Sequence, residues 1–192
     1  AFLRACKEAG HAYTHDLNGA QQEGFGPMPM TVAQGKRSST SRSYLRPVKD
    51  RRNLQVLTQA QVQRIKMRGN QAVCVEVMLK GQIERLTAAK EILLCAGAIN
   101  SPQLLMLSGI GPGAHLHAMG LETLVDSPQV GQNLMDHLEV YVQQACTEPV
   151  SLHKHLGFLG RAKIGVQWLT TPTGLGATNH FEVGGFVRSD PR

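Results

Sequence analysis

The stretch that most constrains the fold covers residues 92–112 and reads ILLCAGAINSPQLLMLSGIGP. It opens with four apolar residues followed by Ala-Gly-Ala, a pattern typical of a strand buried on both faces, as in a parallel sheet. Ser101 and Pro102 then have the properties of a helix start, because a serine hydroxyl can cap free backbone N–H groups and proline suits the first helical position. Gly109 is expected to end the helix. The stretch therefore predicts a buried strand over residues 92–95, a tight turn and a helix.

Gly97 stands at the end of this predicted strand. Because glycine has no Cβ, a flat ligand or another stretch of backbone can lie directly against it. A packing glycine of an ordinary α/β domain explains the local pattern equally well. The residues alone leave both interpretations open.

The composition indicates a globular protein of mixed α/β or α+β class. A chain of 192 residues with 42% hydrophobic residues and 20 glycines can form one large domain or two small ones, and it is too apolar for a disordered chain. No apolar run approaches the roughly 20 residues needed to cross a bilayer.

The net charge of +6 allows a nucleic acid or an anionic membrane as a partner without requiring either. The densest basic run, residues 36–52, contains only one aromatic residue, Tyr44, that could stack on a base. We therefore expect a solvated surface there and no nucleic-acid partner. Residues 151–171 mix apolar and basic residues; we favour packing within a domain and keep a peripheral membrane contact as the alternative.

The four cysteines, Cys6, Cys74, Cys95 and Cys146, are widely spaced and form no C-x-x-C pair. Cys74 and Cys95 lie within apolar strand patterns. We therefore expect buried, reduced thiols, with neither a disulfide framework nor a metal site.

A meander of three antiparallel strands is predicted just before the central stretch. Residues 54–67 and 71–79 have strand propensity, and the second run alternates apolar and other residues with the period of a half-buried strand. Residues 80–82 are suited to a turn, and residues 83–88 form the third predicted strand.

Three motifs carry a resemblance to a known family. Residues 97–111 resemble the second signature of the glucose–methanol–choline (GMC) family of FAD oxidoreductases and fit that pattern without a mismatch. Residues 23–47 resemble the family segment EGFG…GKR-x-S…YL-x-P, with Ser38 where the choline-oxidising members usually have an aromatic residue. Residues 128–137 resemble PGVG-x-NL-x-DH, with Gln129 in place of a glycine. The choline-oxidising members are the most similar.

The resemblance implies a domain organisation. Residues 1–137 are expected to form part of a Rossmann-like FAD-binding domain that includes the signature 97–111 and the antiparallel meander. Residues 138–192 are expected to begin an antiparallel-sheet substrate domain.

The resemblance also implies FAD as the cofactor and assigns residues to it. In the family, the residue that matches Val62 contacts the adenine end of FAD through its backbone, and the turn at Ala96, Gly97 and Ala98 lies beside the cofactor. Without the resemblance, Val62 is an ordinary strand valine.

Glu182 is the candidate substrate-binding residue. A regular strand would place His180, Glu182 and Phe186 on one face. A carboxylate beside aromatic rings suits a quaternary ammonium group, and the choline-oxidising members have a glutamate in this strand that contacts the trimethylammonium head. The alternative is a structural glutamate paired with a neighbouring arginine.

The implied reaction is oxidation of choline to betaine aldehyde by hydride transfer to FAD, with an unknown electron acceptor and a mitochondrial location. No catalytic residue is assigned, because the histidine base of the family is expected beyond residue 192. Asp136 and His137 are adjacent in sequence and are therefore expected to be cap or supporting groups.

The sequence has no Gly-x-Gly-x-x-Gly fingerprint and no initiator methionine, so we expect an internal segment that is inactive alone and binds FAD weakly. Two alternatives stay open. One is a GMC enzyme that acts on an aryl or aliphatic alcohol, and the other is a non-catalytic basic module that binds RNA or membranes.

Overall fold

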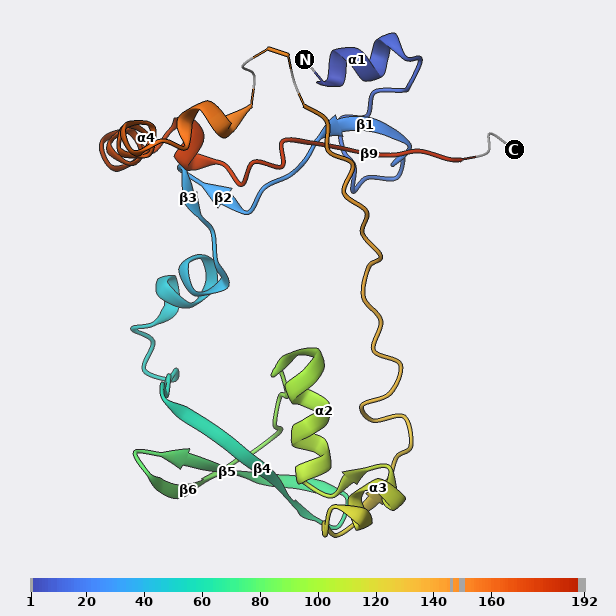
Figure 1. Ribbon diagram of the computed structural model, residues 1–192. Coiled ribbons are helices and arrows are strands. Elements are labelled where there is room, and N and C mark those ends of the chain that lie inside the picture. Colours follow the sequence, from blue (N-terminus) through green and yellow to red (C-terminus); the bar gives the residue numbers. More distant parts are fainter. Residues whose placement is uncertain (1, 146, 149–150, 190–192) are drawn as a thin grey trace. The chain divides into compact units, whose positions relative to one another are not determined.

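A computed structural model describes residues 2–145, 147–148 and 151–189, so Cys146 lies outside the described residues (Figure 1). The chain forms two compact units. Unit 1 contains Ala1–Leu54 together with Gln143–Arg192, and unit 2 contains Gln55–Val142.

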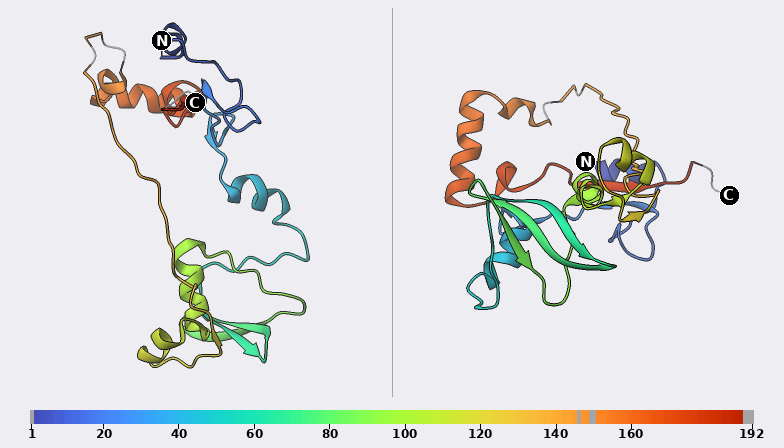
Figure 2. Two further views of the ribbon diagram at one scale, coloured as in Figure 1. Left: turned by 90° about the vertical axis from the view of Figure 1, so that its right-hand side faces the viewer. Right: turned by 90° about the horizontal axis from the view of Figure 1, so that it is seen from below.

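Unit 2 is built on an antiparallel three-stranded sheet of β4 (Ala60–Arg68), β5 (Gln71–Leu79) and β6 (Gln82–Thr87), in the order β4-β5-β6. Lys80 and Gly81 connect β5 to β6 with φ of 50° and 83°, as a tight two-residue hairpin turn requires. Figure 2 shows this sheet from below. The predicted meander is confirmed.

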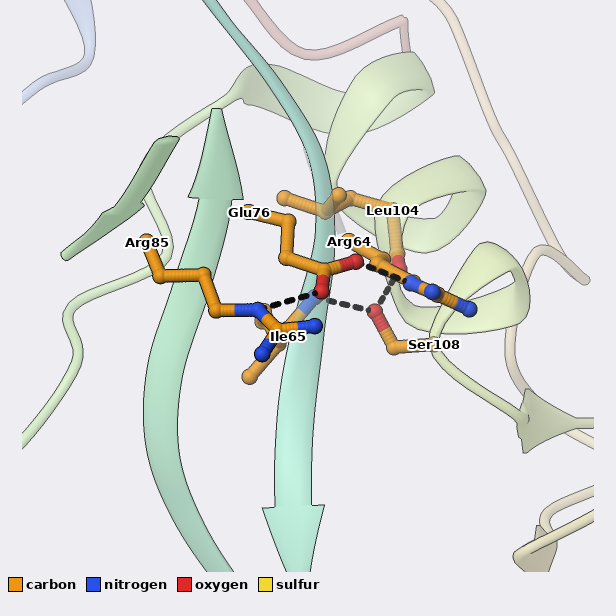
Figure 3. A network of polar contacts seen from close by, with 6 residues as sticks. All are labelled: Arg64, Ile65, Glu76, Arg85, Leu104 and Ser108. Atoms are coloured by element: carbon orange, nitrogen blue, oxygen red, sulfur yellow. Dashed lines mark hydrogen bonds and ion pairs between the residues drawn. The ribbon is translucent and has the colours of Figure 1, made fainter. Parts of the chain in front are cut away.

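Helix α2 (Gly97–Leu107) packs against β4, and a polar contact from Ser108, just after the helix, joins the two. The Ser108 hydroxyl accepts the N–H of Ile65 at 2.8 Å and donates to the Leu104 carbonyl at 2.6 Å (Figure 3). Ile65 and Leu104 are both buried, so the small core of this unit lies where the sheet meets the helix.

The predicted strand over residues 92–95 is wrong. These residues form no strand, Leu93 is 76% exposed, and Cys95 is exposed rather than buried. A strand needs a neighbour to pair with, and within the described residues none pairs with this run. Cys74 is half-buried.

The predicted start of α2 is also wrong, because the helix begins at Gly97, one turn earlier. The Ser101 hydroxyl accepts the N–H of Ala96, which precedes the helix, at 3.1 Å, and Pro102 lies inside the helix. The backbone is already helical when the chain reaches Ser101, so this serine ties the preceding turn to the helix instead of capping its first N–H groups. Gly109, with φ of 82°, follows the helix as predicted.

The rest of unit 2 is a compact strand–helix–strand arrangement. The short strands β7 (Ile110–Gly111) and β8 (Val125–Asp126) are parallel, and α3 (Gly113–Ala118) lies between them in sequence. The Asp126 carboxylate accepts the N–H of Gly113 at 2.8 Å, at the start of α3, and Leu116 is fully buried.

Unit 1 begins with α1 (Phe2–Glu8) and contains an antiparallel pair of β1 (Gly24–Pro27) and β9 (Val183–Phe186), which lie side by side in Figure 1. A hairpin of β2 (Val32–Ala33) and β3 (Lys36–Arg37) follows. Two short helices, η1 (Ser41–Leu45) and η2 (Arg46–Val48), end this part of the unit.

The C-terminal part of unit 1 is helical before it reaches β9. It contains η3 (Leu152–His155), α4 (Phe158–Thr170) and η4 (Gly174–Ala177). No helix among the described residues is both long and apolar enough to cross a membrane.

Candidate cofactor and substrate sites

A cleft of about 550 Å³ lies in unit 2 between the first half of β4, residues 92–96 and one side of α2. Val62 and Ala96, two of the predicted cofactor-binding residues, both line it. Gly97 and Ala98 start α2 beside Ala96 and are exposed, but they are not among the lining residues. The structure therefore brings together the meander and the signature motif, which are some 30 residues apart in the sequence.

The pattern of hydrogen bonds between β4, β5 and β6 determines the direction in which the backbone N–H and C=O of Val62 point. Val73 of β5 accepts the N–H of Ala88 at 2.9 Å, so the odd-numbered residues of β5 bond toward β6 and the even-numbered ones toward β4. Val77, which is opposite Val62, therefore bonds toward β6. As a consequence, Val62 directs its N–H and C=O away from β5, out of the sheet edge.

The backbone of Ile65 also points away from β5, as the same hydrogen-bond pattern requires. Its partner is Val75, another odd-numbered residue, and its N–H leaves the sheet edge to reach the Ser108 hydroxyl at the end of α2. The register shifts between Val62 and Arg64, so Gln63 is an extra residue that keeps both outward-pointing residues on the same edge. Val62 thus presents an unused donor and acceptor at the edge where α2 and the cleft lie.

Gly97 has an open surface. Its φ is +90°, a backbone conformation that favours glycine. Apart from the chain neighbours and the adjacent backbone of α2, no atom of the described residues lies within 4 Å of the position a Cβ would occupy. Flat groups can therefore approach the backbone at this turn without meeting a side chain. Together with the outward backbone of Val62, this arrangement fits the adenine end of FAD.

Two polar side chains in the cleft were not predicted from the sequence. Asn100 and Gln103 project from α2 and line the cleft beside the apolar Leu104 and Leu107. The available signal was the spacing, because two amides three residues apart lie on one side of a helix whose only other polar side chain is Ser101. Their side chains offer further donors and acceptors to a heterocycle.

An ion-pair network supports the sheet next to the cleft (Figure 3). The Glu76 carboxylate on β5 is almost fully buried and binds the guanidinium groups of Arg64 and, at 3.0 Å, Arg85. The hydrogen bond from Arg64 holds the pKa of Glu76 below its ordinary value, against the opposing effect of burial. Because all three meander strands contribute one member, the network ties the strand register together.

Glu182 lines a separate cavity of about 330 Å³ in unit 1. Its backbone carbonyl accepts the N–H of Met28 at 3.0 Å, immediately before the β1–β9 pairing begins. Within the described part of the chain, no cation lies within ion-pair distance of its carboxylate. The cavity is lined by Ser151, Leu152, Lys154, His155, Leu175, His180 and Glu182.

The predicted common face of His180, Glu182 and Phe186 is wrong. The strand begins only at Val183, and His180 has φ of +65°, which is incompatible with an extended strand. Side chains before this kink do not follow the alternation of the strand. The rings that line the cavity of Glu182 are the imidazoles of His155 and His180.

Asp136 and His137 do not form a side-chain pair. The Asp136 carboxylate accepts the backbone N–H of His137 at 2.8 Å, and both residues are exposed. This geometry agrees with a supporting role for them and gives no general base.

Comparison with known proteins identifies the family. The sequence model described as GMC oxidoreductase matches residues 1–139. The mitochondrial choline dehydrogenase of Mus musculus is 52% identical over 191 residues, which cover 100% of this chain and 32% of that protein. The oxygen-dependent choline dehydrogenase of Brucella suis biovar 1 is 48% identical over 189 residues, covering 98% of this chain and 34% of that protein.

A solved structure of the formate oxidase of Aspergillus oryzae RIB40, described for its FAD modification, superposes with a TM-score of 0.84 at 27% identity, covering 97% of this chain and 33% of that one. The chain thus spans about a third of the length of these relatives. It belongs to the GMC oxidoreductase family, which confirms the predicted family and the fold class.

Proposed function

We propose that this chain is a segment of a FAD-dependent dehydrogenase that oxidises choline to betaine aldehyde. The observation that carries the proposal is the 52% identity to the mouse choline dehydrogenase along the whole chain. Identity to the formate oxidase is only 27% over a similar part of the chain, so the likeness to choline dehydrogenases exceeds what a shared fold requires. The activity is proposed for a polypeptide of the relatives' length, because this chain spans 32% of the mouse protein.

In this proposal the cleft of unit 2 receives the adenine end of FAD. The outward N–H and C=O of Val62 would bind the edge of the adenine, and the glycine turn at Ala96, Gly97 and Ala98 would allow close approach to the backbone. When bound, FAD supplies the acceptor for the hydride of the alcohol. The residues of this chain orient the cofactor, and none of them is assigned a proton-transfer role.

Glu182 is the proposed partner of the choline ammonium group. Glu182 lines a cavity of about 330 Å³, and its carboxylate is free of an ion-pair partner among the described residues. A carboxylate without an ion-pair partner attracts a quaternary ammonium group, which can offer no hydrogen-bond donor and is held by charge and by contact with rings.

The experiment is anaerobic mixing of the full-length, FAD-loaded protein with choline. Choline should bleach the flavin absorbance, and 3,3-dimethyl-1-butanol, a neutral alcohol of the same shape, should do so at much higher concentration. Bleaching by the neutral alcohol alone would contradict the choline assignment. A purified full-length protein without flavin absorbance would contradict the cofactor site.

A second candidate is oxidation of another alcohol by the same family machinery. Lys154 and His155 line the cavity of Glu182, and basic groups do not favour a cationic substrate. Replacing Glu182 by Gln in the full-length enzyme separates the two candidates. A choline enzyme should show a raised KM for choline with little change for the neutral alcohol, and equal changes for both would favour the second candidate.

The division into a cofactor domain over residues 1–137 and a substrate domain from residue 138 is also proposed. The family match, which ends at residue 139, supports this boundary. The compact units divide the chain differently, at residues 54 and 142, because β1 pairs with β9 across the two proposed domains. Contacts define the units, whereas the proposed domains are defined by what each binds.

The proposed mitochondrial location rests on the mouse and human choline dehydrogenases, which are named as mitochondrial. The Brucella relatives match almost as well, so import of the full-length precursor into isolated mitochondria is the deciding measurement.

We also propose a peripheral membrane contact at the start of α4. Phe158 and Leu159 are 87% and 81% exposed there, as apolar side chains that enter a membrane surface would be. Loss of vesicle binding after Phe158→Ser would support that contact.

A further inference from the structure

Trp168 joins two segments of unit 1 that are far apart in the sequence. Its indole is half-buried on α4, and Nε1 donates to the Gly35 carbonyl at 2.7 Å. Gly35 lies in the β2–β3 turn with φ of +67°, and a Cβ there would overlap the carbonyl oxygen of Pro172, just after α4. The hairpin and the end of α4 are therefore in direct contact, with no room for a side chain between them.

The same side chain supports η4. A Cβ on Gly176 would lie 3.0 Å from Cβ and 3.3 Å from Cγ of Trp168, and 3.3 Å from a methyl group of Ile164. The backbone of η4 thus rests on Trp168 as closely as a glycine permits. Removing the indole would take away part of the surface on which η4 rests and leave the contact with Ile164.

From η4 the chain runs directly into the turn that precedes Glu182. The Thr178 hydroxyl accepts the N–H of His180 at 3.0 Å, and the Asn179 amide oxygen accepts the N–H of Phe181 at 3.1 Å. These two bonds stabilise the left-handed conformation of His180. On its other side, Glu182 is held by the bond from Met28 to its carbonyl.

We propose that Trp168 is a positioning residue for Glu182. The segments on both sides of Glu182 determine where its carboxylate lies. After it comes the β1–β9 pairing, and before it comes the turn at 178–181, which follows η4 where η4 contacts Trp168. The bond from Trp168 to Gly35 keeps the indole in the orientation that η4 needs. The inference rests on the proposed role of Glu182 in binding choline.

The first test is amide hydrogen exchange in the full-length flavoprotein. Trp168→Phe keeps a ring and removes the donor, and Gly35→Ala disturbs the same contact without changing the indole. Both should speed exchange at the His180 and Phe181 amides about three- to tenfold, the effect of losing one hydrogen bond. The control is Leu169→Ala, the neighbouring position, which is 76% exposed and should leave these amides unchanged. Unchanged exchange in both test variants would overturn the proposal.

The second test measures KM for choline and for 3,3-dimethyl-1-butanol in the same variants. Misplacing Glu182 should raise the choline KM about three- to tenfold and the KM of the neutral alcohol less than about twofold. Equal changes in both values would show a merely structural role and would also overturn the proposal. If the unsubstituted protein does not oxidise choline, the proposed function fails, and the exchange measurement still decides whether Trp168 controls the segment before Glu182.

Discussion

The hydroxyl of Ser108 accepts the backbone N–H of Ile65 at 2.8 Å, across 43 residues of sequence. Both residues are buried, and this bond uses a free N–H of the β4 edge to attach the end of α2 to the sheet. It therefore sets how far α2 stands from β4, and with it the width of the candidate cofactor cleft.

Replacing Ser108 by Ala should destabilise the full-length protein by about 1–3 kcal/mol, because it leaves the Ile65 N–H buried without an acceptor. The free energy of unfolding in urea measures this effect. Ser127→Ala, at a half-buried serine of the same unit, is the control and should change stability by less than about 0.5 kcal/mol. An equal loss in both variants would mean that the Ile65–Ser108 bond has no special weight.

The Glu76 network should make stability depend on pH. The hydrogen bond from Arg64 lowers the pKa of Glu76 in the folded state, so the carboxylate binds its proton less readily folded than unfolded. The stabilisation is therefore complete above the unfolded pKa of about 4.3 and is lost as the pH falls through the lower, folded pKa.

Glu76→Gln gives the matched comparison, because it keeps the shape of the side chain and removes the charge. The difference between the urea midpoints of the unsubstituted protein and the variant should be constant near neutral pH and should shrink at pH values below about 4.3. Two midpoint curves that stay parallel down to the acid range would exclude Glu76 as the titrating group.

The sequence was informative where structure depends on neighbours along the chain. The β4–β6 meander was predicted because an alternating pattern and turn-forming residues at 80–82 are local properties. The strand predicted over residues 92–95 is absent from the structure, because burial and strand pairing depend on partners elsewhere in the chain, and an apolar run shows only that a partner is needed.

In the candidate site, too, the sequence indicated some features and only the structure shows the others. The residues alone allow a free surface at Gly97 without requiring one, and nothing in a strand valine indicates that its backbone faces outward. The outward direction of the Val62 backbone depends on which residues of β5 bond to β4 and on the extra residue Gln63, and only the structure shows these. The expected face of Glu182 failed for a related reason, since one left-handed residue, His180, ends the alternation.

Gly97→Ala tests the open turn. The site has space for a methyl group, so the stability cost comes from φ of +90° alone and should be about 1–2 kcal/mol. The new methyl group should also weaken FAD binding, measured as a raised Kd on titration of the apoprotein. Gly120→Ala is the matched control, because Gly120 has φ of +70°, has the same free space and, unlike Gly97, is not next to a residue that lines the cleft. It should cost similar stability and leave the Kd for FAD unchanged; equal Kd values for the two variants would remove Gly97 from the site.

Val62→Pro tests whether FAD binds the backbone of β4 rather than a side chain. Proline removes an N–H that the ladder does not use, so the fold should lose little stability, while the Kd for FAD should rise about three- to tenfold, as expected for one lost hydrogen bond. Val62→Ala keeps the N–H and should leave the Kd almost unchanged. Gln61→Pro is the structural control. Gln61 pairs with Met78, an even-numbered residue of β5 that bonds toward β4, so losing the N–H of Gln61 should destabilise the sheet by about 1–3 kcal/mol. If Val62→Pro unfolds the protein as Gln61→Pro does, the N–H of Val62 belongs to the ladder and the adenine site must be sought elsewhere.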